Sequence, residues 1–215
     1  MATVGILGGT GPAGRGVAVR LASCGHDVLI GSRDAARAHD AAARLAARAG
    51  SIVGASNDDA AHADLVIVAT PWDSAVATVS ALRDALADKT VISMVNALAK
   101  EGRELTPLYP PRGSMAAQIA NALPDSTIVG AFHHLPAAMM EDLDSDLDAD
   151  VLVFSDDDFA RTRVAELIDE MPGLRAVVAG SMSLASAVEA FTAVCVSLNI
   201  RYRTHSYLKL AGLTH

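Results

Sequence analysis

A cluster of glycines near the start of the chain is the strongest chemical signal in the sequence. Residues 8–16 read Gly-Gly-Thr-Gly-Pro-Ala-Gly-Arg-Gly, so Gly9, Gly11 and Gly14 satisfy the pattern GxGxxG. The pattern follows a short apolar run and opens a helix-like stretch, which is the context it requires. The first glycine permits a tight turn, the second lets backbone approach a pyrophosphate, and the third lets helix and strand pack closely. These residues predict a dinucleotide phosphate site.

Pro12 indicates which backbone groups would bind the phosphates. Proline has no N–H and suits the first turn of a helix, where that donor would have no partner. The predicted donors are therefore the N–H groups of Gly11 and Ala13, with the Thr10 hydroxyl adding one bond. The alternative is a tight turn with a purely structural role.

The end of the second expected strand indicates the type of dinucleotide. An NAD site would place Asp or Glu about 20 residues beyond the glycine loop, to bind the ribose hydroxyls. This chain has Gly31-Ser32-Arg33 instead, and Arg37 follows one helical turn later. A guanidinium fork matches a phosphate, so Ser32, Arg33 and Arg37 predict a 2′-phosphate and hence NADP. Asp34 is interpreted as a helix cap; the alternative for the arginines is a solvated helix surface.

Two further turns follow buried apolar runs, and ligands of open α/β sheets bind beyond the carboxyl ends of the strands. The first turn is Thr70-Pro71-Trp72, with the single tryptophan of the chain. Its flat ring is suited to packing on a nicotinamide or on a planar substrate. The alternative is an ordinary packed aromatic at a helix start.

The second turn reads His133-His134-Leu135-Pro136-Ala137. Neighbouring side chains on an extended chain point to opposite sides, so the two histidines are poor joint metal ligands and we predict no metal site. His133 is a candidate general acid, but no Lys, Tyr or Ser–His arrangement supports that role. The alternative is a hydrogen-bonded loop. The remaining histidines are expected in solvent or at turns: His26, His39, His62 and His205.

Short apolar runs that alternate with helical patterns predict the elements that position these turns. The pattern is typical of βαβ units and a doubly wound, mainly parallel Rossmann-type α/β sheet. The expected strands are residues 4–7, 28–30, 52–55, 65–69, 91–95, 128–132, 151–154 and 174–178. The expected helices are residues 12–24, 34–48, a helix capped by Asp73, and one from 156 to about 171. Residues 100–113 are expected to form a long loop.

The end of the chain differs in kind. From residue 183, apolar side chains recur in steps of four and three at Leu184, Val188, Phe191, Cys195, Leu198 and Tyr202. This seam predicts one long helix that buries its stripe against its own domain or a second copy. We expect a homodimer, and a division into a nucleotide-binding domain, residues 1–180, and a helical segment, residues 181–215, that closes the cleft or forms the dimer interface.

Composition limits the possible classes of protein. With 51% hydrophobic residues, the 215-residue chain is not disordered, and 25 acidic against 17 basic residues, a formal charge of −8, argue against nucleic-acid binding. Cys24 and Cys195 form no metal-ligand pattern. We expect no signal peptide at the start of the chain. We also expect no membrane span, because Glu189 and several polar residues interrupt the most apolar stretch. The expected location is the cytoplasm.

These motifs together resemble the NADPH-dependent coenzyme F420 reductases, also called F420H2:NADP oxidoreductases. The resemblance runs through nearly the whole chain. It rests on the glycine loop with Gly14 and Gly16, then Gly25-His26, Gly31-Ser32-Arg33, Pro71-Trp72, Leu135-Pro136-Ala137-Ala138 after His133, Gly173-Leu174-Arg175, Ala179-Gly180 and residues 184–189. Glycine loops are shared with many enzymes, whereas the combination is much more restrictive.

The resemblance implies direct hydride transfer between nicotinamide C4 and C5 of an 8-hydroxy-5-deazaflavin, both bound in one cleft. Such chemistry needs alignment and exclusion of water more than an acid or base, so no catalytic residue is assigned. The resemblance implies that residues 10–13, Ser32, Arg33 and Arg37 hold NADP. It further implies that the ring pocket is lined by His133, Leu135, Pro136 and Ala137.

The anionic tail of F420, a phosphate and glutamate, poses a separate question for a chain of charge −8, since some local basic group must offset the repulsion. Residues 96–113 look divergent, so the resemblance assigns no tail contacts there. The candidates are Lys100, Arg103, Arg112, Arg201 and Arg203. The direction of hydride transfer stays open.

Two other functions fit the same residues. The first is an NADPH-dependent reductase of a small imine or ketone, resembling pyrroline-5-carboxylate reductase. The second is a non-enzymatic NADP sensor whose tail helix signals to a partner. The first would turn over NADPH with a small carbonyl or imine, and the second would bind NADP without turnover.

Overall fold

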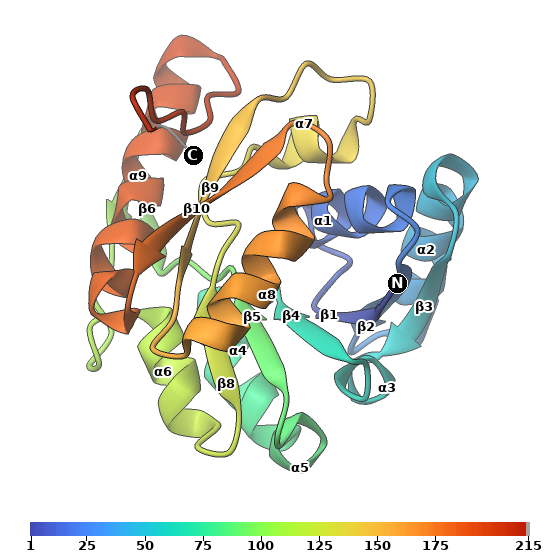
Figure 1. The fold of residues 1–215 in the computed structure, drawn as a ribbon. Helices are drawn as coiled ribbons and strands as arrows, with labels where there is room; N and C mark the ends of the chain where they lie inside the picture. The colour runs from blue at the N-terminus through green and yellow to red at the C-terminus, as the bar shows by residue number, and fades with distance from the viewer. Residues whose placement is uncertain (214–215) are drawn as a thin grey trace.

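Eight strands form one twisted sheet in the computed structural model, which describes residues 1–213 (Figure 1). Their order is β10-β9-β8-β5-β4-β1-β2-β3. The six neighbouring strands β8, β5, β4, β1, β2 and β3 are parallel to one another. β9 and β10 are parallel to each other but antiparallel to β8. The strands are β1 Thr3–Leu7, β2 Asp27–Ser32, β3 Ile52–Ser56, β4 Leu65–Val68, β5 Thr90–Ser93, β8 Thr127–Gly130, β9 Ala149–Phe154 and β10 Leu174–Gly180. The predicted Rossmann-type fold is confirmed.

Helices cover both faces of this sheet, and each face has its own apolar core. One core contains buried residues of α1 (Pro12–Ser23), α2 (Ala35–Ala49) and α8 (Asp158–Asp169), with Met140 of α7 (Ala137–Glu141). The other contains residues of α3 (Asn57–Ala61), α4 (Trp72–Ala81), α5 (Arg83–Leu86), α6 (Met115–Ala122) and α9 (Ala185–Tyr202), which the short 3-10 turn Met182–Leu184 precedes. The strands between the two layers are buried on both sides, which explains their continuous apolar runs.

The chain changes direction between β1 and β4, and this point positions the functional turns. After β1 it builds β2 and β3 on one side, and β4 then returns to the other side of β1. The loops after β1 and β4 therefore diverge from neighbouring strand ends, and ligands bind in the crevice between such loops.

The predicted loop 100–113 is wrong in part, because its first half is an antiparallel hairpin. β6 (Leu98–Glu101) pairs with β7 (Glu104–Pro107) through a tight turn in which Gly102 has a φ of +62°. The hairpin contacts α9, where Ser197 Oγ accepts a hydrogen bond from the Leu105 N–H at 2.8 Å. These strands have four residues each, and three of the eight are charged, so their apolar pattern was too weak to indicate them. The short helices α3, α6 and α7 were also missed, and the one helix expected after Asp73 is divided at Leu82 into α4 and α5.

Two predicted side-chain roles are wrong. Helix α4 begins at Trp72 with Pro71 as its N-cap residue, and Asp73 lies inside its first turn rather than capping it. His26 is buried, not at a solvated turn: its Nε2 lies 2.9 Å from Glu170 Oε2, and its Nδ1 accepts a hydrogen bond from the Ala2 N–H. The predicted Asp34 cap of α2 is confirmed, since its carboxylate accepts from the Arg37 N–H at 3.2 Å.

The apolar seam of the C-terminal helix divides between two environments. Val188 and Cys195 are buried against the domain, whereas Leu184, Phe191, Leu198 and Tyr202 are exposed. Among described residues, the segment Met182–Tyr202 is long and apolar enough to cross a membrane by length and composition alone. It also carries buried Glu189, whose carboxylate accepts hydrogen bonds from the N–H groups of Met115 and Ala116, so its inner face is packed on α6.

Candidate functional site

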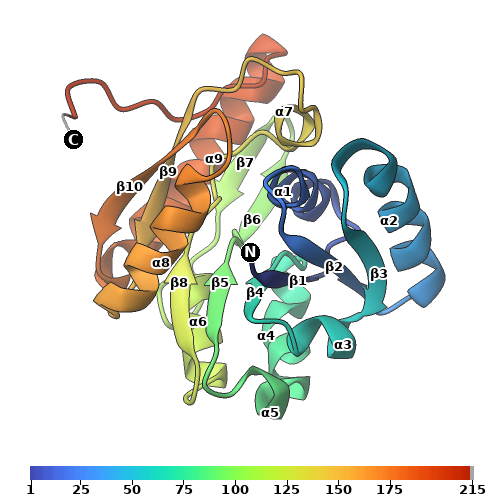
Figure 2. The same ribbon diagram turned by 45° about the vertical axis from the view of Figure 1, so that its right-hand side comes forward.

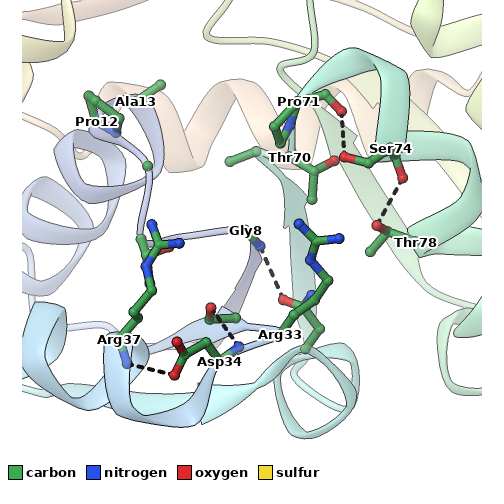
Figure 3. A pocket seen from close by; sticks show the side chains of 15 residues that line it. Gly8, Pro12, Ala13, Arg33, Asp34, Arg37, Thr70, Pro71, Ser74 and Thr78 are labelled. Atoms are coloured by element: carbon green, nitrogen blue, oxygen red, sulfur yellow. Dashed lines mark hydrogen bonds between the residues drawn. The ribbon is translucent and has the colours of Figure 1, made fainter.

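A cavity of about 560 Å³ lies over the carboxyl ends of β1, β2 and β4 (Figure 3). Its walls come from the glycine loop, the turn between β2 and α2, and the segment that leads from β4 into α4. The lining residues are Gly8, Thr10, Gly11, Pro12, Ala13, Ser32, Arg33, Asp34, Arg37, Asn57, Ala69, Thr70, Pro71, Ser74 and Thr78. The structure therefore brings together three turns that were predicted separately.

The glycines of the loop have the different roles that their spacing predicted. A Cβ atom on Gly14 would lie 2.8 Å from Gly9 Cα, so helix α1 packs against the turn at a distance only glycine allows. A Cβ atom on Gly11 would meet nothing closer than Gly8 O at 3.6 Å, and Gly11 faces the cavity. The prediction of Gly11 N–H as a free donor is wrong, since it donates to Gly8 O at 3.2 Å. The Ala13 N–H lies in the first turn of α1, where backbone donors have no partner within the helix, and its bond to a phosphate stays a prediction.

Positive charge lines the opposite wall. Arg33, at the end of β2, and Arg37, in the first turn of α2, extend into the cavity from two sides (Figure 3). Ser32 Oγ accepts a hydrogen bond from the Asp34 N–H at 3.1 Å, and the Asp34 carboxylate is turned to its capping bond. The carboxylate is thus held at the helix start, and two guanidinium groups are available to a phosphate.

Three polar residues of this cavity were not predicted. Asn57 Oδ1, at the start of α3, accepts a hydrogen bond from the Gly8 N–H at 3.1 Å and so fixes the glycine loop. Ser74 and Thr78 share one face of α4, because their spacing is one helical turn. That spacing is the only sequence signal that could have indicated them, whereas Asn57 reaches Gly8 only through tertiary folding.

Thr70 is the polar group of this cavity most in need of a partner. Its Oγ1 is buried and has no hydrogen-bond partner among residues 1–213. A buried hydroxyl without a partner is costly, so a ligand atom that bonds to it would be favoured.

A second cavity, of about 520 Å³, adjoins the first. Its lining combines the turn after β8, the start of α7, the hairpin and α9. The lining residues are Pro12, Ala13, Met94, Asn96, Leu98, Phe132, His133, His134, Leu135, Pro136, Ala137, Ala138, Thr192, Cys195, Val196, Asn199, His205 and Ser206. Most of these side chains are apolar, which suits a flat ring system. His205 is exposed, as expected, and it also lines this wall.

His133 is the central polar group of the second cavity. Its imidazole is stacked on Phe154, with ring centroids 5.5 Å apart, and neither ring nitrogen has a partner within the described part of the chain. Burial, aided by neighbouring His134, lowers its pKa to about 3. The imidazole is therefore neutral near pH 7, which argues against the candidate role of general acid and favours a hydrogen bond to a ligand.

The backbone before His133 is held in an unusual conformation. Phe132 has a φ of +65°, a region that residues with side chains rarely adopt. The following carbonyl, of His133, accepts hydrogen bonds from Asn96 Nδ2 and Thr192 Oγ1, both at 3.3 Å, and His134 Nε2 donates to Val188 O at 2.7 Å. Helix α9 thus fixes the turn that carries both histidines.

Pro12 and Ala13 line both cavities, so the two spaces meet at the N-terminus of α1. Trp72, a predicted contact, lines neither cavity and is 40% exposed. Gly9 and Gly14 also stay behind the cavity surface, in the packing of the loop. Of the cations suggested for an anionic tail, none within residues 1–213 lines either space; Arg201 is paired with Glu104 at 3.0 Å.

The chemistry of the two cavities is different. The first offers guanidinium groups, a helix N-terminus and hydroxyls, a donor set for a dinucleotide with a 2′-phosphate. The second offers apolar walls and a neutral imidazole. Within residues 1–213 no group of three or more His, Cys, Asp or Glu side chains is placed to hold a metal ion.

Known proteins of one family match nearly the whole chain. Residues 3–97 match the family model described as NADP oxidoreductase, coenzyme F420-dependent. The chain is 36% identical over 212 residues to the F420-dependent NADP reductase of Methanocaldococcus jannaschii, and the match covers 94% of each protein. A crystal structure assigned as an F420-dependent NADP reductase from Arthrobacter sp. FB24 superposes with a TM-score of 0.85 and 26% identity, over 98% of this chain and all of that one.

A more distant structure is informative about the fold alone. A pyrroline-5-carboxylate reductase from Coxiella burnetii gives a TM-score of 0.57 at 18% identity, over 82% of this chain and 58% of that one. It shares the Rossmann-type fold. The nearly full-length match, at 36% identity, to the Methanocaldococcus jannaschii enzyme and the match to the family model together show that this chain belongs to the F420-dependent NADP reductase family.

Proposed function

We propose that this protein transfers a hydride directly between NADP(H) and coenzyme F420. The single observation that carries the proposal is the meeting of two unlike cavities at Pro12 and Ala13. One cavity has the charges for a phosphorylated dinucleotide and the other has the apolar walls for a flat ring. The relatives named F420-dependent NADP reductases match 94% and 98% of the chain.

The residues of the first cavity fit NADP. Arg33 and Arg37 would hold the 2′-phosphate together with Ser32, and the first turn of α1 would face the pyrophosphate. The open space at Gly11 leaves room for the pyrophosphate to approach the backbone. Beyond it, the unpartnered Thr70 hydroxyl and the apolar edge of Pro71 lie on the route towards the second cavity.

The residues of the second cavity fit the deazaflavin ring of F420. Leu135, Pro136 and Ala137 would pack on the ring, and the neutral His133 imidazole, with two free nitrogens, would bond to a polar atom at its edge. When bound, the deazaflavin and the nicotinamide supply the hydride chemistry between them. This chain contributes binding, alignment and exclusion of water, and no side chain needs to exchange a proton.

The decisive experiment mixes the protein with NADP and reduced F420 and follows the visible absorbance of the oxidised deazaflavin. We expect the absorbance to rise in step with NADPH formation. Binding of NADP without any change in absorbance would overturn the proposal and favour an NADP sensor. Turnover of NADPH with a cyclic imine but not with F420 would favour an imine reductase instead.

We further propose that the enzyme is a cytoplasmic homodimer, in which residues 181–215 close the second cavity on one side and contact a second copy on the other. Thr192, Val196 and Asn199 line the cavity from the inner face of α9. The outer face of the same helix carries a stripe of exposed apolar side chains, Leu184, Phe191, Val194, Leu198 and Tyr202. Such a stripe marks an interaction surface. Residues 214 and 215 of this segment lie outside the described part.

A further inference from the structure

We propose that the ion pair between Arg15 of α1 and Glu141 of α7 is a positioning device that sets the separation of the two bound rings. The inference rests on the proposed function. Neither residue is assigned a role in binding, and neither lines the two main cavities. Their effect would be exerted through the two short segments that they join.

The two segments approach each other more closely than side chains usually allow. Helix α1 passes α7 at Gly16, where a Cβ atom would lie 2.6 Å from Met140 Cβ and 3.2 Å from Ala137 O. Glycine at this position lets the helices touch backbone to backbone. A small rotation at this contact would therefore move α7 relative to the glycine loop.

The C-terminal end of α7 is fixed to α1 by a buried arginine. The Arg20 guanidinium is 3% exposed, and its donors bind the carbonyl oxygens of Met139, Met140 and Asp142 at 2.8–3.1 Å, and Ser145 Oγ at 3.0 Å. Terminal helix carbonyls that have no partner within the helix are thereby satisfied. This end of α7 is a fixed pivot.

Arg15 connects α7 to the glycine loop itself. Its Nε donates to Glu141 Oε2 at 3.0 Å, and its Nη1 donates to Thr10 O at 2.9 Å. Both paired side chains are less than a third exposed. One guanidinium thus binds the carbonyl of Thr10, which lines the first cavity, and the carboxylate of Glu141 on α7. The first residue of α7, Ala137, lines the second cavity.

The consequence concerns the place where the cavities meet. Pro12 and Ala13 begin α1 on one side, while Pro136 and Ala137 begin α7 on the other, and all four line the second cavity. The angle between the helices sets the width of this junction. Hydride transfer depends steeply on the separation and alignment of donor and acceptor, so small displacements that leave binding intact reduce the rate.

The test measures single-turnover hydride transfer from NADPH and from 4-deuterated NADPH to F420, and the Kd of each substrate. For Arg15→Gln and for Glu141→Gln we expect a rate roughly tenfold lower, with both Kd values unchanged within about twofold and a kinetic isotope effect more dependent on temperature. Because the residues act as one unit, the double variant should be no slower than either single variant. Arg15→Lys should recover part of the rate.

The matched control is Arg48→Gln, which removes a more exposed arginine whose contact, to Asp142 Oδ1, is longer at 3.5 Å. It should transfer hydride at the wild-type rate. The proposal is overturned if the single variants keep the wild-type rate and isotope effect, if their effects multiply in the double variant, or if only a Kd changes. Failure of the wild-type protein to reduce F420 at all would instead refute the proposed function.

Discussion

Arg33 and Arg37 occupy the place where a dinucleotide-binding chain selects between NAD and NADP. They extend into the first cavity from the end of β2 and the start of α2, while the nearby Asp34 carboxylate is engaged in capping α2. The residue types and their distance from the glycine loop predicted this arrangement. Its energetic consequence is confined to the 2′-phosphate, because a guanidinium at this wall has no partner in NAD.

Arg33→Ala should weaken NADP binding roughly 10- to 100-fold, the value of one charge-assisted hydrogen bond, and should leave NAD binding unchanged. Titration calorimetry with both dinucleotides measures the two affinities. Arg44→Ala is the control, since Arg44 lies on the exposed face of α2 and donates to Asp40 O. An equal loss of affinity for both dinucleotides would show that Arg33 has a structural role.

The glycines of the loop allow a second prediction at the residue scale. Gly11→Ala places a methyl group in ordinary van der Waals contact, 3.6 Å from Gly8 O, at an ordinary φ of −71°, so the thermal midpoint should stay within a few degrees while NADP affinity falls. Gly14→Ala places the methyl group 2.8 Å from Gly9 Cα. The free energy of unfolding should therefore fall by about 1–3 kcal/mol, and the thermal midpoint should fall with it. Differential scanning fluorimetry with and without NADP separates the two. Similar destabilisation by both would contradict the division of roles.

At the scale of elements, α9 lines the second cavity and also fixes the turn beside it. Its Glu189 carboxylate accepts hydrogen bonds from the N–H groups of Met115 and Ala116, at 2.7 and 2.9 Å, at the start of α6. Burial raises the pKa of Glu189 to about 7, against the two backbone hydrogen bonds, which act to lower it. One turn further on, Thr192 holds the His133 carbonyl. One helix therefore carries a buried acid and fixes a buried base.

These two groups should make opposite contributions to the pH dependence of stability. The pKa of His133 is lowered from 6.5 to about 3, so its contribution is full above pH 6.5 and is lost as the pH falls towards 3. The pKa of Glu189 is raised from 4.5 to about 7, so its contribution is full below pH 4.5 and is lost as the pH rises through 7. Between pH 4.5 and 6.5 the two dependences offset each other, each at up to about 1.4 kcal/mol per pH unit.

Urea denaturation between pH 4.5 and 6.5 tests this compensation. Glu189→Gln should make the free energy of unfolding rise with pH, because the His133 contribution is then unopposed. His133→Leu should make it fall with pH, for the opposite reason. If the free energy of unfolding depended on pH in the same way in both variants and in the wild-type protein, the pKa values of Glu189 and His133 would not be shifted by folding.

At the scale of the whole molecule, the outer face of α9 is the surface that most needs a partner. The C-terminal residues cross the start of β9 and β10 rather than this face (Figure 2). They are fixed there by Asp150, whose carboxylate accepts from the Leu210 N–H and binds Arg175 at 2.6 and 2.7 Å. The stripe from Leu184 to Tyr202 is therefore left uncovered by the described residues.

Val194→Glu should convert the proposed dimer into a monomer, because a carboxylate in the centre of the stripe would be buried in the dimer interface without a partner. Light scattering coupled to size exclusion measures the mass. Phe159→Glu on α8 is the matched control, since Phe159 is more exposed but lies outside the stripe. A wild-type protein that elutes as one chain would refute the homodimer.

The sequence by itself determined the sheet, the glycine loop and the choice of NADP. Each depends on local patterns: buried parallel strands are continuously apolar, a phosphate turn needs glycines at fixed spacing, and Ser32-Arg33 follows a strand directly. Such features involve residues within a few positions of one another, so their meaning survives without knowledge of the fold.

Only the tertiary structure decided how the second cavity is built. The hairpin and His205 contribute through contacts between residues tens of positions apart, as Asn57 does in the first cavity, and the short strands of the hairpin are stabilised by docking on α9 rather than by their own pattern. The same holds for the exposure of Trp72 and the burial of His26, because a single aromatic or imidazole ring carries no periodicity. Long-range packing sets their environment, and it also places Pro12 and Ala13 between the two cavities.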